Sequence, residues 1–94
     1  MYVVVRRYTG AQKLIDVMVE RQSEVKDLIS SVPGFRAYYA VNTGSGGVVT
    51  VTACDDQAGT TESSRRAAEW VRANAPGSTS GPPEISEGET YINF

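Results

Sequence analysis

The chain has 94 residues, the length of one domain, with a net charge of −2 and 40% hydrophobic residues. A domain this small has a modest core, so oligomerisation would help to stabilise it. The sequence contains no histidine and one cysteine, which excludes Ser-His-Asp and Cys-His catalytic sites and an ordinary zinc site. We therefore expect no metal.

Charge and hydropathy also limit the class of partner. A net charge of −2 implies no basic face, which argues against a nucleic-acid partner. No segment approaches the ~20 consecutive apolar residues of a membrane-spanning helix. The N-terminal MYVVVRRYTG has too short an apolar run for a signal peptide, and its arginines follow that run. Because one cysteine cannot form an internal disulfide, we expect a cytoplasmic protein in a reducing compartment.

The first half of the chain predicts a strand, a long helix and a second strand. Residues 2–8 are rich in β-branched and aromatic side chains, which is typical of a strand. In residues 11–32 apolar side chains recur at helical spacing, and the helix ends at Pro33-Gly34. Arg21 lies within this apolar stripe, and we favour a guanidinium that reaches water over a buried cation. Residues 35–42 form the second strand.

The second half predicts a hairpin, a helix and a last strand. The glycine-rich residues 43–47 suit a tight hairpin loop that leads into a third strand at residues 48–54. Asp55 or Asp56 caps a second helix, which ends at Pro76-Gly77. The stretch GSTSGPP is a loop, and after a polar segment the last strand covers residues 90–94.

The order β-α-β-β-α-β predicts one ferredoxin-like α+β sandwich over residues 1–94, with both helices on one face of a four-stranded antiparallel sheet. In the second strand one face is almost wholly apolar, and we assign it to the helices; its members are Phe35, Ala37, Tyr39 and Val41. The opposite face of the sheet then carries Tyr2, Val4, Tyr8, Tyr38 and part of the last strand. Such a face is too apolar to stay in water, so we expect a second subunit, a ligand or both to cover it.

Five blocks of the sequence, taken in order, resemble one family. They are PGFRAYYAV, a glycine-rich turn, VVTVTACDDQAG, ESSRRAAEWVRAN and PPEISEGE. Together they resemble small bacterial proteins of the antibiotic-biosynthesis-monooxygenase-like group, in the dimeric α/β-barrel superfamily. The resemblance covers essentially the whole chain. It implies a homodimer whose sheets pair back to back, with a pocket between sheet and helices in each subunit.

The same resemblance implies two kinds of activity. Some members oxidise anthrones or quinols with oxygen and no cofactor, using Asn, Trp and Tyr side chains around the pocket. Others degrade haem through a histidine ligand, which this chain lacks. The resemblance therefore implies a protein without a cofactor, and Trp70, Asn74, Tyr38 and Tyr39 are residues of the matching types.

The candidate ligand-binding residues are Tyr8, Arg36, Tyr38, Trp70 and Tyr91. Tyrosine phenols can hydrogen-bond to and stack on a planar phenolic substrate, although aromatic residues also favour strands as ordinary core residues. Arg36 or Arg6 can stabilise a carbanion or phenolate, or else form an ion pair. Trp70 can donate its indole N–H to a substrate, or seal a helix against the sheet. No catalytic residue is assigned.

Three functions remain open at this point. The first is a cofactor-independent monooxygenase acting on a small quinol- or anthrone-type aromatic, which rests on the resemblance and on the Trp, Tyr and Arg content. The second is a small-ligand-binding dimer without catalysis, which rests on the missing general base. The third is a structural dimer with a filled barrel, which predicts no cavity large enough for a drug-sized ligand.

Overall fold

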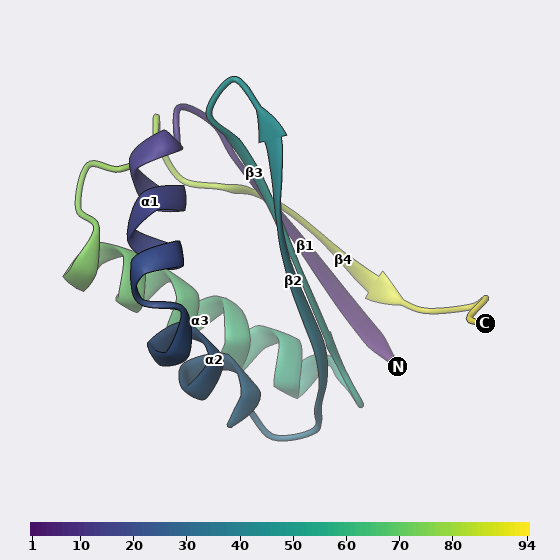
Figure 1. Cartoon of the computed structure of the whole chain (residues 1–94). Coiled ribbons are helices and arrows are strands. Elements are labelled where there is room, and N and C mark those ends of the chain that lie inside the picture. Colours follow the sequence, from purple (N-terminus) through teal and green to yellow (C-terminus); the bar gives the residue numbers. More distant parts are fainter.

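A computed structural model describes all 94 residues as a four-stranded antiparallel sheet covered by helices on one face (Figure 1). In chain order the elements are β1 (Tyr2–Tyr8), α1 (Gln12–Glu20), α2 (Gln22–Ser30), β2 (Phe35–Gly44), β3 (Gly47–Cys54), α3 (Gln57–Asn74) and β4 (Glu84–Glu89). The strand order β2-β3-β1-β4 confirms the ferredoxin-like α+β architecture. None of the helices combines the length and the apolar character needed to cross a membrane.

The predicted first helix is divided in two at Arg21. Its φ of −111° and ψ of 35° depart from helical values, and Figure 1 shows the axis changing direction between α1 and α2. No glycine or proline stands at this position to signal a break. The helical spacing of the apolar residues therefore predicted one continuous helix. Arg21 is exposed and its guanidinium donates to Asn74 Oδ1 on α3 (2.6 Å), so it is not a buried cation.

The last strand is Glu84–Glu89, and the prediction of a strand at residues 90–94 is wrong. Strand β4 pairs with β1 from Arg7–Glu84 to Tyr2–Glu89, and the last bond along it joins Thr90 N–H to the Met1 carbonyl (2.8 Å). Strand β1 spans Tyr2–Tyr8, and its pairing with β4 stops at this point. The available partner therefore overrides the higher strand propensity of the final residues.

The two faces of the sheet are the reverse of our assignment. Tyr38 packs against the core, whereas Tyr39 on the outer face is 62% exposed. A register shift between Phe35 and Ala37 breaks the simple alternation, so Phe35 also packs on the helix side. The outer face is the apolar one; it carries Val3, Val5, Ala37, Tyr39, Val41, Val49 and Val51.

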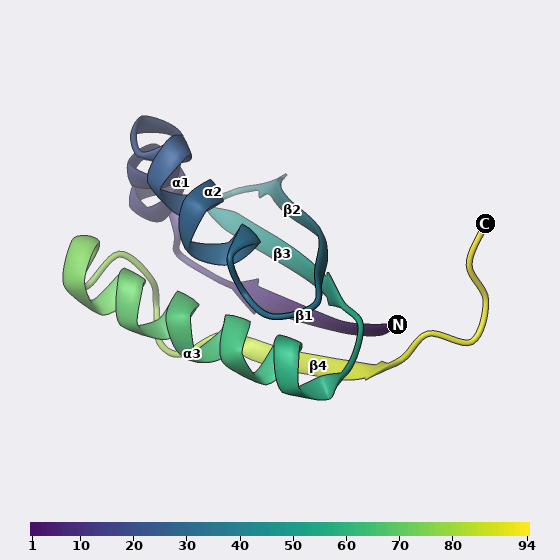
Figure 2. The ribbon, with the colours of Figure 1, turned by 90° about the horizontal axis from the view of Figure 1, so that it is seen from below.

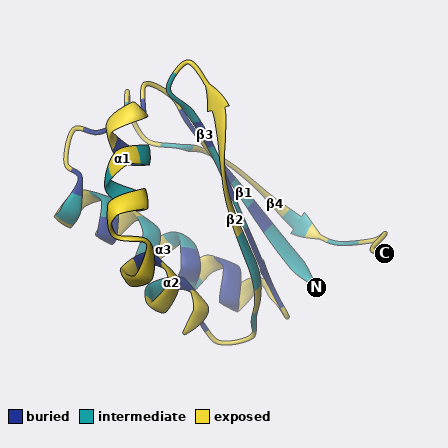
Figure 3. Cartoon of the chain, viewed as in Figure 1, coloured by how far each residue is buried: buried dark blue, intermediate teal, exposed yellow.

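The core lies between the sheet and the helices, and Figure 3 shows buried residues along β1, β3 and α3. Helix α3 packs on β3 and β1, while α2 packs on β2 (Figure 2). The start of α3 agrees with the sequence, because the Asp56 carboxylate accepts from Gly59 N–H (3.3 Å). The hairpin at Gly44–Gly47 is also as predicted, with positive φ at Gly44 and Gly46.

Candidate functional site

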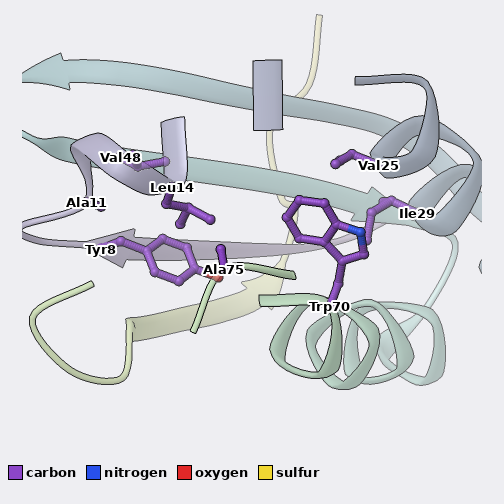
Figure 4. Packing of buried hydrophobic residues seen from close by; sticks show 8 residues of the cluster. All are labelled: Tyr8, Ala11, Leu14, Val25, Ile29, Val48, Trp70 and Ala75. Carbon is purple, nitrogen blue, oxygen red and sulfur yellow. The ribbon is translucent and has the colours of Figure 1, made fainter. Parts of the chain in front are cut away.

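Three of the predicted ligand-binding residues meet in one apolar cavity between the sheet and the helices. Tyr8 comes from β1, Tyr38 from β2 and Trp70 from α3, and all three line it. Figure 4 shows Tyr8 beside Leu14 at one end of the core cluster and Trp70 directed toward Val25 and Ile29 at the other. The cavity measures only about 20 Å³, which is space for roughly one water molecule. These side chains therefore nearly fill it.

The Trp70 indole joins α3 to α2. Its Nε1–H donates to Glu24 Oε1 (2.9 Å), and the Asn74 side-chain amide donates to the Trp70 carbonyl oxygen (3.0 Å). Arg21 then donates to Asn74, which links the break between α1 and α2 to the same group. With its N–H already used by Glu24, Trp70 acts here as a wall of the cavity that fixes one helix against another.

The two phenols in the cavity have no protein partner. Neither the Tyr8 nor the Tyr38 hydroxyl hydrogen-bonds to another group of the chain, although Tyr8 is buried and Tyr38 half-buried. Burial raises the pKa of Tyr38 to about 12 and raises the pKa of Tyr8 as well. Both phenols are therefore neutral at pH 7 and can each donate a hydrogen bond.

Arg6 lies beside these phenols on the inner face of β1, and it is a buried cation that forms no ion pair. The residue is 1% exposed, yet all its partners are neutral hydroxyl groups on β3 and α3; they are Thr50, Thr52, Ser63 and Ser64. Burial lowers the pKa of Arg6, and the nearby Tyr8, Tyr38, Cys54 and Glu87 partly offset this. The sequence indicated that Arg6 could supply charge, but not that it would be buried.

Open pockets lie on both sides of the filled cavity. A groove of about 640 Å³ runs between α1, α2 and β2, and it shares Met18, Val25, Ile29 and Tyr38 with the cavity. On the other side, a pocket of about 460 Å³ shares Tyr8 and Val71 with it. Both volumes fall in the range of small-molecule sites. The small volume of the central cavity agrees with a filled barrel, whereas the flanking pockets leave space for a ligand.

Two of the predicted residues lie away from the cavity. Arg36 is exposed on β2, and its Nε is 2.6 Å from Asp55 Oδ1 in a surface ion pair. Tyr91 is 93% exposed in the extended C-terminal segment that Figure 1 shows leading away from the sheet. Cys54 is fully buried, and burial raises the pKa of its thiol, so it acts as a small core residue. No three His, Cys, Asp or Glu side chains are grouped to hold a metal ion.

Comparison with solved structures finds this arrangement in several proteins, although the sequence matches no protein-family model and no curated protein. A protein of unknown function from Nitrosomonas europaea superposes with a TM-score of 0.76 at 21% identity, covering 99% of this chain and 91% of that one. The ActVA-Orf6 monooxygenase of Streptomyces coelicolor, solved with nanaomycin D, gives 0.72 at 19% identity, covering 99% and 89%. A dimeric ferredoxin-like protein from an uncultured marine organism gives 0.69 at 9% identity, covering 99% and 95%.

At these identities the likeness establishes the fold. It spans nearly the whole length of both chains in every case, so the agreement is between complete domains. The same likeness extends to a structure described as an antibiotic biosynthesis monooxygenase, with a TM-score of 0.65 at 15% identity. The protein therefore has the ferredoxin-like α+β fold of antibiotic-biosynthesis-monooxygenase-like proteins and of dimeric ferredoxin-like proteins.

Proposed function

We propose that this protein is a cytoplasmic homodimer that binds a small quinol- or anthrone-type aromatic between its sheet and helices and oxidises it with oxygen, without a cofactor. The observation that carries the proposal is the meeting of two unpartnered phenols, Tyr8 and Tyr38, in an apolar cavity beside the buried Arg6. The groove that shares Tyr38 with this cavity gives the ligand a route from solvent. Trp70 limits the depth to which the ligand enters.

The residues present suit the stabilisation of an oxyanion. When an anthrone loses a proton from its methylene, the negative charge develops on its oxygen. Neutral phenols can donate hydrogen bonds to that oxygen, and the Arg6 charge lies in a dry environment where its field is strong. Ten of the eleven residues lining the cavity are hydrophobic, so little water competes with these groups.

The substrate itself supplies every electron in this reaction. The methylene carbon loses two hydrogens and gains one oxygen atom, while the other atom of O₂ leaves as water. The four electrons that reduce O₂ come from that carbon, so no external reductant is needed. No histidine or carboxylate lines the cavity, and we assign the first proton transfer to none of its residues.

That missing base favours a second candidate function, a dimer that binds an aromatic ligand without turning it over. An apolar cavity with a few polar groups is typical of a binding site, whether or not chemistry follows. Oxygen consumption separates the two candidates. Saturable binding of the anthrone with no oxygen consumed above the buffer rate would support binding alone.

The homodimer is supported by the outer face of the sheet. This face is apolar and uncovered in the single chain, and one of the similar structures is described as dimeric. The sequence interpretation expected dimerisation through the face carrying Tyr8 and Tyr38, but that face is occupied by the helices. We therefore propose that the opposite face, which includes Val5, Val51 and Tyr39, meets the second subunit.

The test is oxygen uptake with anthrone and with hydroquinone, measured for wild type, Tyr38→Phe and Tyr8→Phe. Removing one oxyanion donor typically lowers turnover by about 100-fold, and we expect a drop of that order in each variant. Tyr91→Phe is the matched control, because this tyrosine is 93% exposed in the C-terminal segment and lies away from the cavity. Uptake that survives unchanged in both Tyr8→Phe and Tyr38→Phe would refute the assignment of these phenols.

A further inference from the structure

No carboxylate contacts the charge on Arg6, and Glu87 acts on it only from a distance. Its Nη2 donates to Ser63 Oγ (2.7 Å), its Nε to Ser64 Oγ (3.2 Å) and its Nη1 to Thr52 and Thr50 Oγ1 (3.2 and 3.4 Å). No carboxylate forms an ion pair with it. Buried charges are usually paired, because hydroxyl groups satisfy the donors without neutralising the charge. This cation is therefore solvated by the protein but remains available to an anion.

The 460 Å³ pocket beside Arg6 has a strongly one-sided charge. It lies between α3, β4 and the loop at residues 75–83, which connects these two elements (Figure 2). Its fifteen lining residues include two arginines, Arg6 and Arg72, and no aspartate or glutamate. Arg72 is exposed and forms no hydrogen bond or ion pair with the chain. In a protein whose net charge is −2, this pocket is locally positive.

Hydroxyl donors face the same space. Ser78 is 3% exposed and its Oγ is the one buried side-chain polar atom that has no hydrogen-bond partner. Its backbone N–H is already bonded to the Ala75 carbonyl (3.2 Å), so only the hydroxyl is left over. Ser64 Oγ accepts from Arg6 and donates to no protein acceptor, which leaves its proton free. A buried polar atom without a partner, such as Ser78 Oγ, is rare in native structures and calls for a partner.

We propose that this pocket binds a small organic anion, a carboxylate carried on an apolar or aromatic body. The carboxylate lies between Arg72, whose exposed guanidinium can meet both of its oxygens, and Arg6, which adds its one remaining Nη2 proton. The Ser64 and Ser78 hydroxyl groups donate to the same oxygens. The apolar body contacts a wall of hydrophobic side chains, which are Tyr8, Ala68, Val71, Ala75 and Ile85.

This site lies next to the one in the proposed function and draws on the same arginine, Arg6, but it has its own rim residue in Arg72. Tyr8 and Val71 line both the pocket and the cavity, and they form the partition between them. Acid binding requires no oxygen chemistry, and it is measured without turnover. Its failure would leave the oxidation of a neutral aromatic untouched, and a protein that consumes no oxygen could still bind the acid.

The probe for this test is benzoate, compared with its neutral analogue benzamide. Calorimetry should give one benzoate site per chain and an affinity at least 10-fold weaker for benzamide. The benzoate affinity should fall as sodium chloride is raised, because the rim arginine is exposed. In ¹H–¹⁵N spectra the amide signals of Ser64 and Ser78 should move. Equal affinities for the two compounds would overturn the proposal.

Two substitutions on the same helix give a matched comparison. Arg72→Gln should weaken benzoate binding at least 5-fold, whereas Arg65→Gln should leave it unchanged. Arg65 is on α3 too, but it is bonded to Glu62 and Glu69 and does not line the pocket. Ser78→Ala should weaken binding about 3-fold by removing one donor. An Arg72→Gln protein that binds benzoate as tightly as Arg65→Gln would overturn the proposal.

Arg6→Met tests the centre of the site. Where this variant keeps a wild-type circular dichroism spectrum, it should lose the preference for benzoate over benzamide. A folded Arg6→Met protein that retains the preference would contradict the role of Arg6. Where the variant does not fold, the comparison of Arg72→Gln with Arg65→Gln decides the question.

Discussion

The hydrogen bond between Trp70 and Glu24 predicts an energetic coupling between α3 and α2. Trp70→Phe removes two ring carbons and the N–H donor from a buried position. At about 0.8 kcal/mol per buried carbon, the smaller ring costs about 1.5 kcal/mol of unfolding free energy. The lost hydrogen bond adds about 1 kcal/mol, less than is usual for a charged acceptor because the Glu24 side chain is 50% exposed.

A double-mutant cycle measures that bond. We expect Trp70→Phe to destabilise by about 2.5 kcal/mol, Glu24→Ala by about 1 kcal/mol, and the pair by about 2.5 kcal/mol, a coupling of about 1 kcal/mol. Urea unfolding followed by far-ultraviolet circular dichroism suits the cycle, since the chain has one tryptophan and Trp70→Phe removes the fluorescence signal. Protein concentration is held fixed, because dimer formation also changes apparent stability.

The control for the cycle is Glu20→Ala. Glu20 is an exposed acidic residue of α1 that forms no hydrogen bond or ion pair, so its effect should simply add to that of Trp70→Phe. Additive behaviour of Trp70→Phe with Glu24→Ala, within about 0.3 kcal/mol, would refute the reasoning. The indole would then contribute by packing alone.

Three further predictions test the packing, the titration and the outer face of the sheet. Gly59→Ala should destabilise by about 1–3 kcal/mol in the same urea assay, because a Cβ would lie 2.6 Å from the Pro33 carbonyl oxygen, whereas Gly88→Ala, with open space, should be neutral. The free energy of unfolding should fall by up to about 2 kcal/mol between pH 10 and about pH 12, because in this range the Tyr38 phenol loses its proton in the unfolded state but keeps it in the folded state. Tyr38→Phe should reduce that fall. Val51→Lys on the outer face should yield a monomer by light scattering. Val19→Lys, on the exposed side of α1, should leave the dimer intact. A dimer in both variants would exclude the outer face as the interface.

The order of elements could be predicted from the sequence because each one carries a local signal. Pro33-Gly34, the glycine-rich turn and the Asp56 cap mark boundaries by backbone chemistry that needs no tertiary information. The break at Arg21 has no such signal. The position of β4 depends on where β1 begins, which is a property of pairing between distant residues.

The candidate site was only partly predictable for a related reason. Aromatic type identified Tyr8 and Tyr38 on predicted strands and Trp70 on a predicted helix, and the structure brings these three together. Tyr91 depended on the position of the last strand. Arg36 was named as a source of charge, but its Nε instead meets Asp55. The buried position of Arg6 depends on serines of α3 lying over threonines of β3, which no local pattern contains.

Arg6 also explains why the two faces of the sheet were exchanged. The assignment rested on the second strand alone, where the face of Tyr39 and Val41 is the more apolar one. On the neighbouring strands Arg6, Thr50 and Thr52 point inward, and their mutual hydrogen bonds allow all three to be buried. The face left outside is then the apolar one. Successive side chains of a strand point to opposite faces of the sheet. Turning the polar residues inward therefore turns their apolar neighbours outward.

That alternation makes the two proposals separable by position. In β1, Val5 faces outward and Arg6 inward; in β3, Val51 faces outward, with Thr50 and Thr52 on either side of it facing inward. An outward substitution should therefore change association while leaving the hydroxyl groups around Arg6 in place. Benzoate binding that persists in a monomeric Val51→Lys protein would show that one chain builds the anion site alone. Loss of binding on dissociation would instead mean that the second subunit holds the sheet in the shape this site requires.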